Sequence, residues 1–448
     1  MNRRTFLATP LAAAAAQTTR SNILLLLADN WAYPHASVYG DPVVRTPVFD
    51  SIARQGVLFT NAFAPNPSCS PSRSSLLTGQ ETHRLGSAAN LYGPLAAAIP
   101  TYPELLAKAG YFIGFSGKGW GPGTAKPNPS GQSFPSFEAF LKAAPKGRPW
   151  CFWFGSHDPH VPWDRGRDTA KPDASKIRIP AFLPDVPEVR EDIRDYYSEV
   201  QQFDRECGEH LAQIEPKSTL VVMTSDNGWQ IPRGLANCYD TGVRIPLTVR
   251  WPGRLKPGTK RTDFVSIADL APTFVEAAGV QVPSQMTART LLRDTGRDCM
   301  FLERERHANV RRGDLTYPIR GIRTRDWLYL WNLEPDRWPA GDPELYWAVG
   351  PYGDVDNSRS KQLLSTRKSQ PFFDRVFGKR PAEELYDVRR DPDQVLNLAA
   401  DPAHARTRAE LRRRVEQWMR ETGDPRSAGP TDFFDKVPYT GARARGGE

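Results

Sequence analysis

Residues 21–29 read Ser-Asn-Ile-Leu-Leu-Leu-Leu-Ala-Asp, an unbroken apolar run of strand length that ends in an acid. Hydrophobicity that is continuous rather than alternating predicts a strand buried on both faces, as in a parallel sheet. Three later runs have the same form, at 111–116, 150–155 and 218–224, and each is followed by polar residues. These four runs predict the central strands of one sheet.

Helical patterns separate these strands, at 46–55, 102–109 and 192–214. Alternating strands and helices predict an α/β fold with a central, mostly parallel sheet flanked by helices. In such sheets, ligands bind outside the carboxyl ends of the strands. The polar residues that follow the four runs are therefore expected to share one edge of the sheet: Asp29, Lys118, His157, His160, Asp226 and Asn227.

The C-terminal part of the chain has a different pattern. Residues 327–331, Trp-Leu-Tyr-Leu-Trp, suit an antiparallel strand, and residues 402–422 form a strongly charged helical pattern. We predict a catalytic domain at 21–319 and a smaller α+β domain with an antiparallel sheet at 320–448. The smaller domain is expected to complete the substrate pocket.

The composition is that of an ordinary soluble globular protein, with 39% hydrophobic and 25% charged residues among 448. The basic residues behind the net charge of +8 are spread along the chain, so we expect no nucleic-acid partner. Their field attracts an anionic substrate. No segment is long and apolar enough for stable membrane insertion.

The first 20 residues resemble a twin-arginine-like export signal, because Arg3 and Arg4 precede a mild apolar run that ends at Ala16. Export predicts a periplasmic or secreted protein. The alternative is a cytosolic protein with a disordered basic N-terminus.

The candidate catalytic centre is the stretch at 69–79, Cys-Ser-Pro-Ser-Arg-Ser-Ser-Leu-Leu-Thr-Gly. It predicts a short helix with Pro71 in its first turn, Ser70 or Cys69 as the cap, and a glycine at its end. Free N–H groups at the helix N-terminus favour an anionic group, and Arg73 adds a fixed cation. Cys69 therefore lies where an anion would bind.

The pattern Cys-x-Pro-Ser-Arg followed by Leu-Thr-Gly at 69–79 resembles that of the formylglycine-dependent sulfatases of the alkaline phosphatase-like superfamily. The resemblance implies an alkaline phosphatase-like α/β sandwich, in which a formylglycine-generating enzyme oxidises Cys69 to an aldehyde. The hydrated aldehyde would attack the sulfur of a sulfated substrate and later expel sulfate. A phosphate- or phosphonate-processing relative would normally carry Ser or Thr at this position.

Two Asp-Asn pairs offer oxygen ligands for a metal ion: Asp29-Asn30 and Asp226-Asn227. Hard oxygen ligands select Ca²⁺ or Mg²⁺, and an irregular protein cage favours Ca²⁺. The resemblance implies that the modified Cys69 also touches the metal. Asn30 stands where sulfatases usually have a second Asp, and its amide oxygen can still coordinate with one negative charge fewer.

The sulfatase resemblance also implies roles for basic residues at the sheet edge. Arg73 and Lys118 would hold the anionic oxygens of the substrate. His160, followed by Val-Pro, matches the histidine that protonates the leaving group. His157 is a second candidate for a catalytic role.

Some positions depart from the sulfatase pattern. Trp120 replaces the histidine of the usual Lys-x-His, so either another histidine takes its place or the aromatic ring forms a wall of the substrate site. Arg233 is expected to bind sulfate, with its register shifted by two residues. The candidates for the missing histidine are His35, His83 and His307, and the predicted substrate-binding residues are Arg233, His307, His35 and Trp120.

Within the family, three segments resemble those of the heparan N-sulfatases, or sulfamidases, and their bacterial relatives: 68–73, 157–160 and 384–399. The resemblance implies hydrolysis of an N-linked sulfate from glucosamine in a sulfated oligosaccharide. One alternative is hydrolysis of an O-sulfate ester in another sulfated glycan. The other is a non-catalytic protein that binds sulfated glycan.

Overall fold

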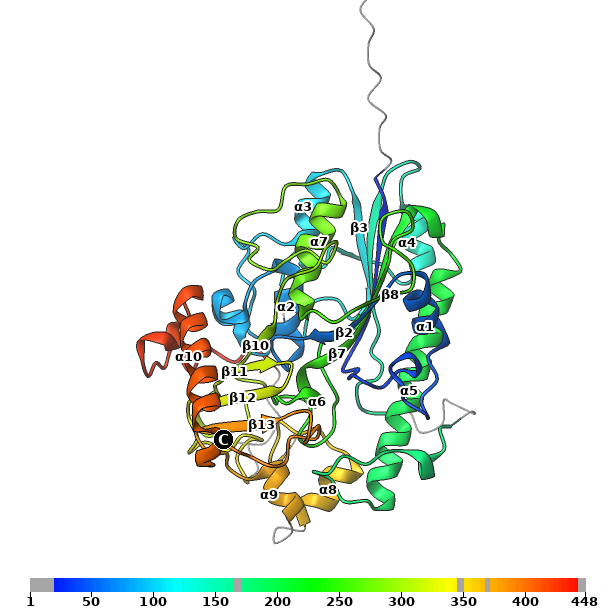
Figure 1. Cartoon of the computed structure of the whole chain (residues 1–448). Helices are drawn as coiled ribbons and strands as arrows, with labels where there is room; N and C mark the ends of the chain where they lie inside the picture. Colours follow the sequence, from blue (N-terminus) through cyan, green and yellow to red (C-terminus); the bar gives the residue numbers. More distant parts are fainter. Residues whose placement is uncertain (1–19, 124, 164–170, 345–349, 367–370, 442–448) are drawn as a thin grey trace, which may run out of the picture.

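The computed structural model describes residues 20–123, 125–163, 171–344, 350–366 and 371–441. The expected export signal at 1–20 lies outside these residues, apart from Arg20. The chain folds around two sheets (Figure 1), a larger one built from the N-terminal part and a smaller one near the C-terminus.

The larger sheet has nine strands in the order β4-β3-β5-β1-β6-β7-β2-β8, with β9 also paired to β2. The four strands expected from the apolar runs are β1, β3, β5 and β6, and they are parallel neighbours, as predicted. The antiparallel member is β7, which pairs with β6 and β2. The strands are β1 (Asn22–Ala28), β2 (Val57–Phe63), β3 (Phe112–Gly117), β4 (Gln132–Ser133), β5 (Trp150–Gly155), β6 (Thr219–Ser225), β7 (Arg244–Arg250), β8 (Thr259–Arg261) and β9 (Val265–Ser266).

Helices cover both faces of this sheet. One layer contains α1 (Pro47–Gln55), α4 (Phe137–Ala143) and α5 (Pro187–Leu211), and the other contains α2 (Cys69–Thr78), α3 (Tyr102–Lys108) and α7 (Leu270–Ala277). Side chains of β1 alternate between the layers: Leu24 and Leu26 pack on the first, and Ile23 and Leu25 on the second. Each such burial stabilises the fold by about 1.5–3 kcal/mol, which explains the continuous apolar run.

One predicted helix has different bounds. The helix expected at 192–214 is α5, which begins at Pro187 and ends at Leu211. The earlier start follows from Pro187 itself, whose fixed φ suits the first helical position and whose missing N–H is not needed there. The helices expected at 46–55 and 102–109 are α1 and α3, each within one residue of the expected bounds at either end.

The smaller sheet is antiparallel, as predicted for the C-terminal part, with the order β10-β11-β12-β13. One face packs on the charged helix at the C-terminus, α10 (Ala405–Thr422), and the other on the larger lobe. Its first strand precedes the expected domain boundary between 319 and 320. The strands are β10 (Cys299–Arg304), β11 (Ile319–Thr324), β12 (Trp327–Asn332) and β13 (Glu383–Asp387), and the short helices nearby are α6 (Asp240–Val243), α8 (Arg359–Thr366) and α9 (Pro371–Phe377).

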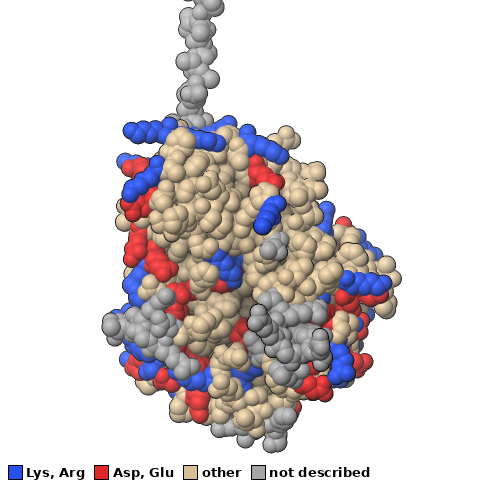
Figure 2. Space-filling view, turned by 180° about the vertical axis from the view of Figure 1, so that it is seen from behind, with Lys and Arg blue, Asp and Glu red and all other residues tan. Residues whose placement is uncertain are grey.

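Basic and acidic side chains are intermingled on the face seen in Figure 2, as the spread of charge along the sequence predicts. Among the described residues, none of the helices combines the length and apolar character that a bilayer crossing needs. All five cysteines are buried and none is in a disulfide.

Candidate active site

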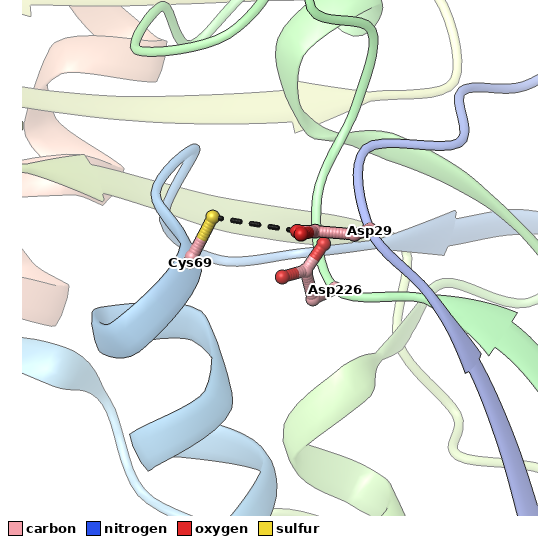
Figure 3. Close-up of side chains that lie close together, drawn as sticks. All are labelled: Asp29, Cys69 and Asp226. Atoms are coloured by element: carbon pink, nitrogen blue, oxygen red, sulfur yellow. Dashed lines mark hydrogen bonds between the residues drawn. The ribbon is translucent and has the colours of Figure 1, made fainter. Parts of the chain in front are cut away.

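Cys69 is the first residue of α2 and its side chain points at the carboxyl ends of β1 and β6 (Figure 3). The helix ends at Gly79, which adopts the left-handed conformation (φ 64°) that glycine tolerates without strain. The N-cap position is Ser68, not Ser70 or Cys69 as expected. Its hydroxyl does not cap the helix, because it is hydrogen-bonded elsewhere.

The four expected metal ligands gather around the Cys69 sulfur. Asp29 Oδ1 is 3.6 Å from Sγ, Asn30 Oδ1 is 4.0 Å away, and Asn227 Nδ2 donates to Sγ over 3.8 Å. Ligand atoms of Asp29, Cys69 and Asp226 all lie within 4.8 Å of one another.

These residues fit a divalent cation. Asn227 Oδ1 is buried, with no hydrogen-bond partner among the described residues. A buried carbonyl oxygen of this kind is costly unless it is satisfied, and rotation of the amide, which now turns Nδ2 toward the sulfur, would let a cation satisfy it. Two carboxylates and two amide groups supply the hard oxygen donors that Ca²⁺ and Mg²⁺ prefer.

Arg73 and Lys118 both bind the metal-ligand carboxylates. Arg73 is fully buried, and its Nε donates to Asp226 Oδ2 over 2.7 Å while Nη1 donates to the carbonyls of Lys118 and Gly119. These contacts make Arg73 a positioning residue for the ligand cluster. Lys118 Nζ lies 2.5 Å from Asp29 Oδ2 and is partly exposed, so it can also meet a bound anion.

The field of these cations keeps Asp29 ionised. Burial alone raises the pKa of its carboxyl, but Lys118, His160 and Arg73 together lower it well below its ordinary value. For Asp226 the balance is reversed: burial raises the pKa, and the attraction of Arg73 does not fully offset it. A cation bound between the two carboxylates would favour the ionised form of both.

The free thiol of Cys69 is a poor nucleophile in this setting. Burial raises its pKa well above the ordinary value, and the neighbouring carboxylates raise it further against the attraction of Lys118. Only the thiolate attacks or ligates well. With these neighbours alone the thiol stays protonated at neutral pH, and the formylglycine that the sulfatase resemblance implies would be the nucleophile in its place.

His160 lies at the same edge, and its contacts define its tautomer. Gln230 Oε1 accepts from the backbone N–H of Val161 over 2.7 Å, so Nε2 of the same amide is the donor toward His160 Nε2 at 3.1 Å. His160 Nε2 then accepts, and Nδ1 donates to the Val161 carbonyl. A doubly protonated His160 has no lone pair for this bond, so Gln230 must release it when His160 carries the proton to be delivered.

His307 lies next to the Cys69 motif, although it comes from the loop after β10. Its Nδ1 is 2.8 Å from Ser68 Oγ. Burial lowers the pKa of His307, and the carboxylates of Asp354 and Asp356 partly counter that effect. Among His35, His83 and His307, the candidates for the missing histidine, it is His307 that contacts Ser68, the residue before Cys69.

The structure does not bring the other expected residues to Cys69. His157 is exposed and lines a separate surface cleft with Glu206 and His210. His35 packs against the rings of α5, and burial lowers its pKa to about 4.

Two further expected residues make internal contacts. Trp120 is 4% exposed, and its Nε1 donates to Ser74 Oγ over 2.8 Å, so its ring belongs to the core and not to an open wall. Arg233 is 3% exposed and donates to the carbonyls of Arg375 and Gln394. His83 forms an ion pair with Glu303 at 2.8 Å.

Sequence reasoning missed Ser68, Gln230 and Asp356. Gln230 follows the Asp226-Asn227 pair closely, and its place just after a strand end was the one available signal. Asp356 comes from the loop before α8 and accepts a hydrogen bond from Gln230 Nε2. Residues 230 and 356 are 126 positions apart, so no local pattern links them.

Comparisons with known proteins agree with this geometry. The family model described as Sulfatase matches residues 21–131 and 126–280, more than half of the chain. Human N-sulphoglucosamine sulphohydrolase is 28% identical over 479 aligned positions, which cover 93% of each chain. An ulvan-active sulfatase of Formosa agariphila is 26% identical, and the alignment covers 92% of this chain and 82% of the relative.

Solved structures share the fold. A protein in complex with its substrate D-glucosamine-2-N,6-O-disulfate has a TM-score of 0.65 at 18% identity, covering 92% of this chain and 100% of its own. A 2-O GAG sulfatase has a TM-score of 0.64 at 19% identity, covering 93% and 96%. These similarities confirm the alkaline phosphatase-like sandwich, and the family match shows that the chain belongs to the sulfatases, a family of hydrolases.

Proposed function

We propose that the protein hydrolyses sulfate from a sulfated carbohydrate, and that its substrate carries an N-sulfated glucosamine. The observation that carries the proposal is the position of Cys69, at the start of α2 among Asp29, Asp226 and their neighbouring amides. The similarity to N-sulphoglucosamine sulphohydrolase supports the choice of substrate, since it extends over nearly all of both chains.

Each side chain around Cys69 has a separate role in the proposed reaction. Formylglycine at position 69 and a divalent cation supply the nucleophile and the Lewis acid when present. Lys118 meets the sulfate oxygens, and its charge stabilises the negative charge that develops on them. His160 stands on the leaving-group side, and Arg73 holds the ligand carboxylates in place.

The cation we propose is Ca²⁺, with Mg²⁺ as the weaker candidate, because the donors come from an irregular set of loops. Removal of the metal with a chelator should abolish sulfate release and lower the melting temperature, since ligand binding stabilises the folded state. Ca²⁺ should restore both more effectively than Mg²⁺ at equal concentration. Full activity after exhaustive chelation would contradict a metal at this site.

We also propose that the protein is exported by its twin-arginine-like segment and that a formylglycine-generating enzyme modifies Cys69. Residues 1–20 fused to a reporter should direct the reporter out of the cytoplasm, and replacement of Arg3 and Arg4 by Lys should retain it inside. Retention of the wild-type fusion in the cytoplasm would contradict export.

The substrate is tested by sulfate release from N-sulfoglucosamine, glucosamine 6-O-sulfate and sulfated ulvan fragments, assayed side by side. The proposal predicts the highest kcat/KM for N-sulfoglucosamine. The ulvan-active relatives favour the second candidate, an O-sulfate ester hydrolase, which predicts the reverse order. Tight binding with no release from any substrate would instead indicate a glycan-binding protein.

A further inference from the structure

Asp356 is linked to His160 through one side chain, that of Gln230. Its Oδ2 accepts a hydrogen bond from Gln230 Nε2, and the same nitrogen contacts His160 Nε2 at 3.1 Å. Asp356 is therefore two hydrogen bonds away from the group that would deliver a proton to the leaving atom. The side chain is half-buried, so part of it remains open to a bound molecule.

The second oxygen of this carboxylate, Oδ1, can accept a further hydrogen bond. Within the described part of the chain, Gln230 is the sole hydrogen-bond donor to Asp356, and it uses Oδ2. Arg359, the nearest cation along the chain, binds Asp192 and Asp195. Lys361 Nζ donates to the Val355 carbonyl over 2.6 Å. Oδ1 is thus an acceptor without a hydrogen-bond donor among these residues.

The loop that carries Asp356 is fixed in place. The preceding acid, Asp354, is buried and binds both Arg304 and Arg311 through Oδ2, at 2.5 and 2.6 Å. Its Oδ1 accepts from the backbone N–H of Ala308. Because charge-assisted bonds anchor the backbone two residues away, Asp356 is preorganised and loses little freedom on binding.

An acceptor at this place distinguishes the two kinds of sulfated sugar. The bridging nitrogen of a sulfamate carries an N–H that can donate a hydrogen bond. The bridging oxygen of a sulfate ester has only lone pairs, which a carboxylate repels. Sites built to pair with a substrate N–H or O–H discriminate strongly against analogues without it, because the buried partner is left unpaired.

We infer that Asp356 is a specificity-determining residue that selects a sulfamate nitrogen over an ester oxygen as the leaving atom. This inference rests on the proposed function. Asp356 Oδ1 accepts the N–H of the bridging nitrogen while sulfur is attacked. When the S–N bond breaks, its electron pair stays on nitrogen and a proton from His160 Nε2 completes the neutral amine, while the sulfuryl group remains on the nucleophile. The amine then leaves with its N–H still directed at Asp356.

The test compares N-sulfoglucosamine with glucose 2-O-sulfate, two substrates that differ in the bridging atom at the same carbon. Asp356→Asn should lower kcat/KM for N-sulfoglucosamine about ten- to a hundredfold, and leave the value for glucose 2-O-sulfate unchanged or higher. Asp356→Glu keeps the acceptor and should keep the preference for the sulfamate. Asp326→Asn, an exposed acid paired with Arg389, is the matched control and should behave as wild type.

A binding measurement adds a readout that does not depend on turnover. Glucosamine, a cation, should bind the wild type more tightly than neutral N-acetylglucosamine by calorimetry, and Asp356→Asn should remove that difference. Asp356→Ser serves the same purpose if the Asn variant fails to fold.

The outcomes separate the inference from the proposed function. If the wild type cleaves N-sulfoglucosamine and a folded Asp356→Asn variant keeps the wild-type ratio of kcat/KM values, the inference is wrong and the proposed function stands. If the wild type releases sulfate from esters alone, the proposed function fails in an assay that involves no variant, and the inference fails with it.

Discussion

The active-site edge of the larger sheet and the core of the smaller lobe both bury many charges, but they use them differently. At the edge, Asp29, Asp226 and Arg73 surround a cluster with an unsatisfied amide oxygen. In the smaller lobe, Arg320 binds Asp424 and Glu305, and Arg426 binds Glu305 on both oxygens. These carboxylates of the smaller lobe are thus paired with guanidinium groups, whereas those at the edge, although paired with Arg73 and Lys118, also converge on the Cys69 sulfur within 4.8 Å.

This difference assigns the charges of the smaller lobe to the stability of the fold and those of the sheet edge to ligand binding. A buried ion pair whose hydrogen bonds are satisfied holds the fold, and the loss of one partner leaves a buried charge uncompensated. A cluster in which two carboxylates, two amides and a sulfur converge on one point can bind a cation.

The largest effect is expected at Cys69. Cys69→Ala removes the group that becomes the nucleophile, so kcat should fall at least about 10³-fold. The melting temperature should change little, because the side chain makes only weak sulfur contacts. Sulfate release and a thermal melt of the same preparation test both parts, and Cys151→Ala, at a buried strand position, is a control that should lower stability without this loss of kcat.

The smaller lobe should show the opposite pattern. Asp424→Asn leaves Arg320 and Arg426 to share the single carboxylate of Glu305, which should destabilise the fold by about 3 kcal/mol. In contrast, kcat of the folded protein should be nearly unchanged. Urea unfolding measures the first quantity, with Asp432→Asn, in an exposed pair with Lys436, as a control that should shift by less than about 0.5 kcal/mol. An equal loss of unfolding free energy in Asp424→Asn and Asp432→Asn would show that the buried ion pairs of the smaller lobe do not stabilise the fold more than an exposed pair.

Gln230 links the active-site edge to the segment before α8, because it contacts His160 and Asp356. Gln230→Ala should lower kcat about tenfold by letting the imidazole reorient, with a smaller change in KM. Steady-state kinetics on one substrate give both values. Gln362→Ala, on the exposed side of α8, is the control, and a change in KM alone would show that Gln230 binds substrate without positioning His160.

The smallest effect concerns the ion pair of His83 and Glu303. Burial lowers the pKa of His83, but Glu303 raises it overall above the ordinary value. A raised folded-state pKa stabilises the protein fully below about pH 6.5, and this contribution is lost as pH rises through the folded-state value. His83→Gln should therefore destabilise by about 1 kcal/mol at pH 6, and by less at pH 9. Denaturant unfolding at both pH values tests this, and an equal loss at both would show that the pair is not charged.

Much of the edge could be predicted from sequence because its residues carry local signals. Asp29 and Asp226 follow apolar strands, and Cys69 begins a helix that a proline and a glycine delimit. Each signal lies within a few residues of the side chain that it identifies. The parallel sheet then brings the strand ends together without further information.

The rest depends on contacts between distant segments. Asp356 meets Gln230 only because the segment before α8, 126 positions further along the chain, packs on the core of the larger sheet, and neither residue has a pattern of its own. Trp120 was expected at the substrate, yet the hydroxyls of Ser74 and Ser130 hold it in the core. Arg233 was expected to bind sulfate, but its backbone has a positive φ of 73° and its guanidinium binds carbonyl groups.

The mass of the tryptic peptide 55–73, isolated from a host with a formylglycine-generating enzyme, shows whether Cys69 is converted to the catalytic aldehyde. Conversion of the Cys69 thiol to an aldehyde lowers the mass by about 18 Da, as expected when the covalent nucleophile is made from this residue. We expect that shift in the active protein, and no such shift in Cys69→Ala. An unmodified thiol in protein that releases sulfate at full rate would contradict it.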